Sequence, residues 1–97
     1  MTEIVYAPRA LADIERLIDY LIEKEQTVAM ATAEVIMDAI TVLSEHPLIG
    51  RPVEEGLRDL VISRGRSGYL ALYRFDLAKD RVLILSIRHQ REGGYRG

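Results

Sequence analysis

Residues 69–89 read YLALYRFDLAKDRVLILSIRH, and this stretch decides the fold. Its two halves, Tyr69–Leu77 and Arg81–His89, are rich in aromatic, β-branched and other apolar residues and flank the turn residues 78–80. This pattern predicts two antiparallel strands joined by a short turn. Residues 82–85 of the second half are apolar without alternation, which predicts a central strand covered on both faces.

The segment before this pair continues the same pattern. Leu57–Ser63 is a third strand candidate, separated from Tyr69 by the turn residues 65–68. Before it, residues 46–56 read HPLIGRPVEEG, with two Pro and two Gly, which predicts a loop. The sequence therefore predicts an antiparallel meander, and a long loop connects it to the N-terminal part of the chain.

Two helices are predicted before the loop. Over residues 8–25, with Pro8 in the first turn, one apolar stripe contains Leu11, Ile14, Ile18, Leu21 and Ile22. Thr27 is a candidate cap for a second helix, which the His46-Pro47 pair ends. Because only about two residues separate the helices, we expect an antiparallel helical hairpin.

Residues 3–6 form a short strand candidate that needs a sheet edge to pair with. The predicted fold class is α+β, in the order βααβββ: an N-terminal strand, then an antiparallel helical hairpin packed on a mainly antiparallel sheet. We expect one domain over residues 1–97, with residues 90–97 as a tail that is mobile or ordered by a partner.

Composition limits the classes of protein to which this chain can belong. The chain has 97 residues, 48% of them hydrophobic and 29% charged, with a net charge of −2, as in ordinary soluble globular proteins. It has no Cys, and its two His are far apart, so we expect no disulfide, no metal and no cofactor. The N-terminal residues show neither a signal peptide nor a membrane span, which predicts a cytoplasmic protein without membrane contact.

Charge is divided unevenly along the chain. Residues 1–50 carry 3 Lys or Arg against 9 Asp or Glu, a net charge of −6. Residues 51–97 carry 10 against 6, a net charge of +4. This split predicts an acidic helical layer and a basic sheet layer within one domain.

Four motifs carry a family resemblance: HPLIGRP after the second helix, then LRDL, SGYLALYRF and VLILSIRHQR. In this order they resemble the ParE/RelE superfamily of toxins from bacterial type II toxin-antitoxin systems, which also act in plasmid stabilisation. The resemblance implies a cognate antitoxin that wraps around the toxin in a hetero-oligomeric complex. It further implies one of two targets: RelE-like members cleave mRNA on the ribosome, whereas ParE-like members inhibit DNA gyrase.

The RelE-like nucleases place basic residues at positions that can be compared with this sequence. Aligned on residues 67–69 and 86–87, Val61 and Ser63 stand at the lysine positions, Leu70 replaces the Arg after the Tyr, and Gln90 is near the final basic site. Cleaving RNA without a metal needs converging cations and a proton acceptor. The resemblance therefore favours a ParE-like gyrase inhibitor without catalytic residues.

The nuclease alternative stays open through a shift of register. It would use Arg88, His89, Arg91 and Tyr95. His89 is then a candidate general base, against a structural role at the strand end. A third alternative is a superfamily member that has lost its toxicity and acts only within its complex.

Five arginines are the candidate partner-binding residues: Arg64, Arg66, Arg74, Arg88 and Arg91. We expect acidic antitoxin side chains to meet them, although an internal carboxylate such as Asp76 or a target surface would also satisfy Arg74 and Arg88. Strand alternation puts Arg74 on one face with Leu70 and Leu72. It puts Arg88 on one face with Val82, Ile84 and Ser86.

Three further side chains are predicted to be structural. Arg58 is expected to make an ion pair or to bind a backbone carbonyl, because acidic residues surround it in the sequence. Tyr69 and Tyr73 share a strand face with Ala71 and Phe75 and are expected to pack in the core against the helices.

Overall fold

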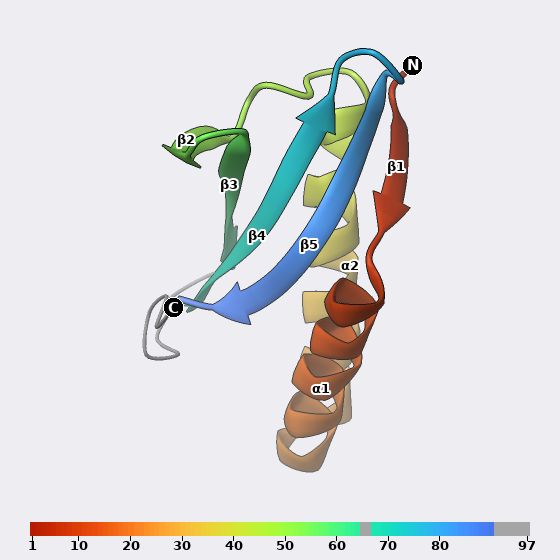
Figure 1. Ribbon diagram of the computed structural model, residues 1–97. Helices are drawn as coiled ribbons and strands as arrows, with labels where there is room; N and C mark the ends of the chain where they lie inside the picture. The colour runs from red at the N-terminus through yellow and green to blue at the C-terminus, as the bar shows by residue number, and fades with distance from the viewer. Residues whose placement is uncertain (65–66, 91–97) are drawn as a thin grey trace.

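The computed structural model describes residues 1–64 and 67–90 (Figure 1). Along the chain the elements are β1 (Glu3–Tyr6), α1 (Pro8–Lys24), α2 (Gln26–Thr41), the 3-10 turn η1 (Val42–Ser44), β2 (Arg51–Glu54), β3 (Leu57–Arg64), β4 (Ser67–Asp76) and β5 (Arg81–His89). The strands form one sheet in the order β1-β5-β4-β3-β2, in which only the β1–β5 pair is parallel. The predicted α+β architecture is confirmed, and β1 pairs with β5, the strand expected to be central.

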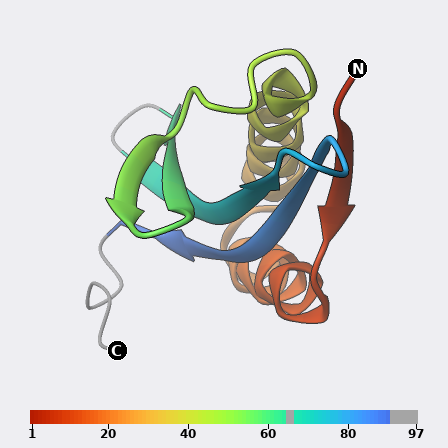
Figure 2. The same ribbon diagram turned by 45° about the horizontal axis from the view of Figure 1, so that its top comes forward.

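Both helices lie on the same face of the sheet (Figures 1 and 2). Helix α1 begins at Pro8, as predicted, and a single residue, Glu25, separates it from α2. Its buried residues are Ala10 and Leu17, whereas Leu11 and Ile22 of the predicted stripe are 55% and 46% exposed. The stripe is rotated because α1 is apolar over a wide arc, and spacing alone does not tell which part of that arc meets the sheet.

The predicted cap of the second helix was wrong. Helix α2 begins at Gln26 with Glu25 as its N-cap and no side-chain cap, so Thr27 lies inside the helix. The one-residue link leaves no room for a separate capping residue. Within α2 and η1 the buried residues are Ala29, Thr32, Ile36, Ile40 and Leu43.

Helix α2 is unusually apolar. Among the described residues, the helical stretch Gln26–Ser44 is long and apolar enough to cross a membrane by length and composition alone. A helix packed in a protein core passes the same test, so this is weak evidence for a membrane role. In this structure Ile36, Ile40 and Leu43 are fully buried in the core.

The predicted loop over residues 46–56 contains a strand. Residues Arg51–Glu54 form β2, which pairs antiparallel with β3 and is irregular at Val53. All four residues of β2 are exposed, so they show no alternation of buried and exposed positions that would reveal a strand. Pro52 is tolerated there because β2 is an edge strand.

The core lies between the helices and the near face of the sheet. Tyr73, Ile36, Ile40 and Ile84 are fully buried there, and Tyr69 is 3% exposed. The predicted core roles of Tyr69 and Tyr73 are therefore confirmed.

Candidate functional site

The face of the sheet that points away from the helices, which we call the outer face, is partly exposed: Leu70 and Asp59 are buried there, at 5% and 2% exposed, whereas its other leucines are half-buried. In β5, Val82, Ile84 and Ile87 are fully buried beneath the helices, whereas Leu83 and Leu85 are only half-buried. The prediction that this strand is covered on both faces was wrong, because both helices lie on one side (Figure 2). Outward positions of an antiparallel sheet that meet water are usually polar, so these leucines need an explanation.

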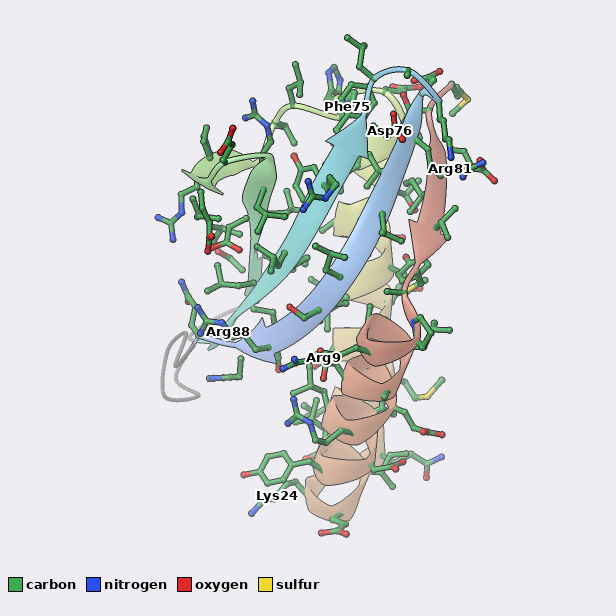
Figure 3. The ribbon with its side chains drawn as sticks, viewed as in Figure 1. Arg9, Lys24, Phe75, Asp76, Arg81 and Arg88 are labelled. Carbon is green, nitrogen blue, oxygen red and sulfur yellow. The ribbon has the colours of Figure 1, made fainter. Side chains whose placement is uncertain are left out.

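The strand register arranges the outer-face side chains in rows across the sheet. From one end to the other the rows are Val61–Leu70–Arg88, Asp59–Leu72–Ser86, Arg74–Leu83–Val5 and Asp76–Arg81–Glu3. Half of the side chains in the two middle rows are apolar, and Val61 in the first row is 46% exposed. Arg88 and Arg81 mark the two ends of the outer face (Figure 3).

A β-bulge in β5 changes which residues reach this face. Leu72 is opposite Ser86 while its neighbour Tyr73 is opposite Ile84, so Leu85 is the extra residue. Arg88 consequently shares the outer face with Ser86, and the prediction that Val82 and Ile84 lie on that face was wrong. The extra residue shifts the alternation by one position.

Helix α1 is tied to β5 beside the bulge. The backbone N–H of Ile87 donates to Asp13 Oδ2 at 2.9 Å. The Asp13 side chain is only 13% exposed and lies 3.8–3.9 Å from the Arg9 and Arg16 side chains. Asp13 therefore supplies an acceptor for a strand amide from the helical layer.

The arginines of the outer face occupy different surroundings. Arg74 is exposed and extends to the β2–β3 turn, where its Nη1 would lie 2.9 Å from a Cβ on Gly56. Gly56 has φ of +77°, a backbone conformation that favours glycine at this turn. Arg88 is half-buried next to Leu70.

The remaining predicted site residues are only partly described. Arg64 ends β3, paired with Ser67, and its side chain is outside the described part of the structure. Arg66, Arg91 and Tyr95 also lie outside the described residues. The predicted tail over residues 90–97 is described only at Gln90, whose N–H donates to the Gly68 carbonyl at 2.8 Å.

The structure separates the two described members of the alternative nuclease set. Arg88 is on the outer face, whereas His89 is on the opposite side of β5, where its ring meets Tyr69 edge-to-face at 5.2 Å between centroids. Neighbouring residues of a strand point to opposite faces, so these two side chains do not converge. The packing on Tyr69 favours the structural role of His89.

Two of the four positions that hold basic residues in RelE-like nucleases fall in one row. Val61 is directly opposite Leu70, with Arg88 next in the same row, and Ser63 is opposite Gly68. The Gln90 side chain lies over Gly68, beside the start of this row. Arg88 is thus the single cation of a row in which Val61 and Leu70 are apolar.

Arg58 and Tyr73 hold the loop before β2. Arg58 Nη1 donates to the carbonyls of Leu48 and Gly50 at 3.1 and 2.7 Å, which confirms its predicted structural role. The Tyr73 hydroxyl donates to the Pro47 carbonyl and accepts from the Gly50 N–H, both at 2.8 Å. A Cβ at Gly50 would lie 2.6 Å from the Tyr73 ring. The glycine in HPLIGRP was the sequence signal for this close approach.

Burial raises the pKa of two tyrosine hydroxyls. Desolvation raises the pKa of Tyr73 above its ordinary 10.0, against the opposing effects of the Gly50 N–H and the Arg58 charge. Desolvation also raises the pKa of Tyr6. Within residues 1–64 and 67–90, no group of three or more His, Cys, Asp or Glu is placed to hold a metal ion.

Comparison with known proteins gives consistent matches over almost the whole chain. Residues 4–93 match the family model described as the ParE toxin of the type II toxin-antitoxin system parDE. Toxin RelE3 of Caulobacter vibrioides is 30% identical over 95% of this chain and 98% of its own length. The chromosomal ParDE system of P. aeruginosa matches with a TM-score of 0.76 at 24% identity, covering 92% of this chain and 96% of that one. The E. coli RelBE toxin-antitoxin complex matches with a TM-score of 0.63 at 20% identity, covering 90% and 94%.

Proposed function

Because the chain belongs to the ParE toxin family of type II toxin-antitoxin systems, we propose that it is a ParE-like toxin that binds DNA gyrase in the cytoplasm and disturbs its DNA-cleaving cycle. The action is occupation of a protein surface and requires no bond to be broken by the toxin. A cognate antitoxin holds the toxin inactive in a hetero-oligomeric complex.

The observation that carries this proposal is the Val61–Leu70–Arg88 row. A nuclease that works without a metal needs several cations around the scissile phosphate and a group to take the 2′-hydroxyl proton. At the four corresponding positions this chain has Val61, Ser63, Leu70 and Gln90, none of which is basic. A face on which half-buried leucines stand among arginines and carboxylates suits a protein partner better than a phosphodiester backbone.

The outer face is the proposed antitoxin site. An extended or helical antitoxin segment would place apolar side chains on Leu72, Leu83 and Leu85 and acidic side chains near Arg74 and Arg88. Both solved structures named above come from toxin-antitoxin systems, which supports a bound antitoxin as the resting state of this fold. Arg64, Arg66 and Arg91 are proposed to extend the same contact.

A supercoiling assay tests the gyrase proposal. Purified toxin, released from its antitoxin, is titrated into gyrase and relaxed plasmid. We expect supercoiling to be inhibited near stoichiometric toxin and restored by added antitoxin. Normal supercoiling in the presence of excess folded toxin would reject the proposal.

A second candidate is a RelE-like endoribonuclease, favoured by the RelE name of the Caulobacter vibrioides relative. It would rely on Arg88, Arg91 and Tyr95, with His89 as the candidate base. Toeprinting on translating ribosomes decides it, because new mRNA ends that the Arg91→Ala/Tyr95→Phe variant no longer produces would establish this activity. The absence of new ends with wild-type toxin would exclude it.

A further inference from the structure

The two halves of β5 have different neighbours on the side of β1. Within the described residues β1 is the only strand on that side of β5, and it pairs with Arg81–Ile84 alone. The Ala7 N–H donates to the Ile84 carbonyl at 2.9 Å, and the chain then leaves the sheet because α1 begins at Pro8. The second half of β5 therefore has helix α1, and not a strand, beside it (Figure 1).

The bulge lies where this strand pairing ends. Leu85, the extra residue, directly follows Ile84, the last residue of β5 that pairs with β1. A bulge disrupts the ladder locally and bends the strand that contains it. Beyond Leu85, residues 86–89 pair only with β4 among the described strands. This part of β5 consequently has less backbone support from the sheet than the part before the bulge.

Asp13 of α1 supports the backbone at this point. Its Oδ2 accepts the Ile87 N–H at 2.9 Å, and its side chain is 13% exposed. A carboxylate that accepts from a backbone N–H makes a stronger bond than a neutral acceptor, and an N–H buried without an acceptor is costly. The Arg9 and Arg16 side chains lie 3.9 and 3.8 Å from the carboxylate and are exposed, so their attraction adds little. The bond to Ile87 is therefore the main contribution of Asp13.

The position of Ile87 determines where its neighbours point. The Ile87 side chain is fully buried beneath the helices, so Ser86 and Arg88 point to the outer face. Without the bulge the alternation would shift by one position, and Arg88 would be opposite Tyr69 on the inner face. The outward direction of Arg88 thus depends on the bulged segment. That segment is held by burial of the Ile87 side chain and by the bond that its N–H donates to Asp13.

We propose that Asp13 is a positioning residue for the partner contact of the outer face: it holds the bulged segment of β5 and thereby keeps Arg88 pointing outward. This inference rests on the proposed function, in which Arg88 meets an acidic side chain of the antitoxin. Asp13 acts through the Ile87 backbone and contributes no contact to the partner. Its effect is to lower the entropic cost of ordering Arg88 when the antitoxin binds.

A double-mutant cycle separates this role from a general effect on stability. The antitoxin expressed from the gene adjoining that of the toxin is titrated into full-length toxin carrying Asp13→Ala, Arg88→Ala or both. The matched control cycle uses Arg74→Ala in place of Arg88→Ala, because Arg74 is also on the outer face but is opposite Leu83, before the bulge. The order parameter of the Arg88 Nε–H in the free toxin and the melting temperature are measured in parallel.

We expect Arg88→Ala to weaken antitoxin binding about tenfold in the wild-type background and about threefold or less in the Asp13→Ala background. Arg74→Ala should weaken binding by the same factor in both backgrounds. The Arg88 Nε–H should have a lower order parameter in Asp13→Ala than in wild type. Asp13→Asn, which keeps a neutral oxygen acceptor, should lie between the two in both measurements. If Asp13→Ala does not fold, the cycle with Asp13→Asn should give a smaller coupling to Arg88 and none to Arg74.

Two outcomes would overturn the inference. Additive effects of the Asp13 and Arg88 substitutions, with an unchanged order parameter at Arg88, would leave Asp13 as a residue that only stabilises the fold. Equal coupling of Asp13 to Arg74 and Arg88 would show a general loosening of the sheet. If Arg88→Ala alone leaves antitoxin affinity unchanged, the antitoxin contact of the proposed function fails, and the order parameter in the free toxin then decides by itself whether Asp13 positions Arg88.

Discussion

In the middle of β5 both faces are apolar, but they differ in what covers them. On the inner face Val82, Ile84 and Ile87 are completely buried beneath the helices. On the outer face of the same strand, Leu83 and Leu85 are only half-buried. The bulge at Leu85 shifts the alternation of side chains by one position, so that Ser86 and Arg88 lie on the outer face.

This difference shows that apolar composition serves two purposes in one strand. Residues covered by the chain's own helices stabilise the fold, since burial removes their surface from water. Residues of the same kind left uncovered contribute less to folding and remain available to a partner. Variants on each face can therefore measure how much that face contributes to the free energy of unfolding.

The largest effect on stability is expected on the inner face. Ile84→Ala leaves a cavity in a fully buried site and should lower the free energy of unfolding by about 2–5 kcal/mol. Leu83→Ala, its neighbour on the outer face, should cost less than half as much. Urea unfolding of both variants measures this, and equal losses would contradict the division between the faces.

A smaller effect is expected where the helical layer holds a strand amide. Asp13→Ala removes the acceptor of the Ile87 N–H and should cost about 1–3 kcal/mol. Asp13→Asn keeps an oxygen acceptor and should recover part of this loss. Thermal unfolding and hydrogen exchange at Ile87 check it. Unchanged protection of that amide in Asp13→Ala would show that the contact is dispensable.

Because of Tyr73, the free energy of unfolding should depend on pH in the alkaline range. Its pKa is raised by burial, so the stabilisation from its neutral hydroxyl is complete below pH 10.0 and is lost as pH rises through the folded-state pKa. Tyr73→Phe should cost about 1–2 kcal/mol at pH 7, by loss of the bonds to Pro47 and Gly50. The variant should also lose less stability than wild type above pH 10.0. If the free energy of unfolding of Tyr73→Phe and wild type falls with the same slope above pH 10.0, this assignment is wrong. Tyr6, whose pKa is also raised, is present in both proteins and contributes equally to both slopes.

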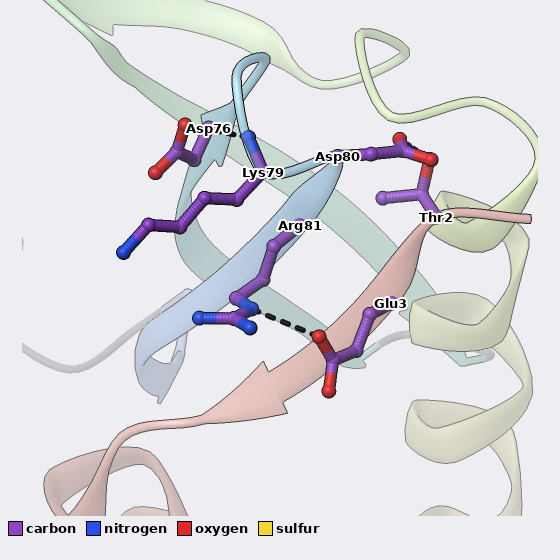
Figure 4. A network of polar contacts seen from close by, with 6 residues as sticks. All are labelled: Thr2, Glu3, Asp76, Lys79, Asp80 and Arg81. Carbon is purple, nitrogen blue, oxygen red and sulfur yellow. Dashed lines mark hydrogen bonds and ion pairs between the residues drawn. The ribbon is translucent and has the colours of Figure 1, made fainter.

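The smallest effect is expected at the charged end of the outer face. Glu3 accepts from Arg81 Nε at 2.9 Å beside the Thr2–Asp80 hydrogen bond (Figure 4), and the two side chains of this ion pair are 58% and 41% exposed. Glu3→Gln should therefore cost at most about 1 kcal/mol, and less at high salt. Urea unfolding at two salt concentrations measures it, and a loss as large as that of Ile84→Ala would show that this face does stabilise the fold.

Local patterns predicted the elements that depend on neighbouring residues. Pro8 marked the start of α1, and the run from Tyr69 to His89 predicted β4 and β5. Features set by distant contacts were missed. Edge strand β2 has no buried face to produce a pattern, and the bulge at Leu85 depends on how β5 pairs with β4.

The candidate functional site shows the same difference between features set by neighbouring residues and features set by distant contacts. The sequence comparison identified Val61 and Leu70 as neutral replacements, and the register places them opposite one another. The loop held by Tyr73 was missed because Tyr73 and Gly50 are 23 positions apart in the chain. Likewise, the separation of Arg88 from Val82 and Ile84 follows from the bulge, which simple alternation does not include.

The central claim is that this toxin harms the cell by binding a protein and not by cutting RNA. The most direct measurement is to induce it without antitoxin and record plasmid topology and mRNA 5′ ends from the same culture. The account predicts altered supercoiling with no new transcript ends. Fresh transcript ends with unchanged plasmid topology would contradict it.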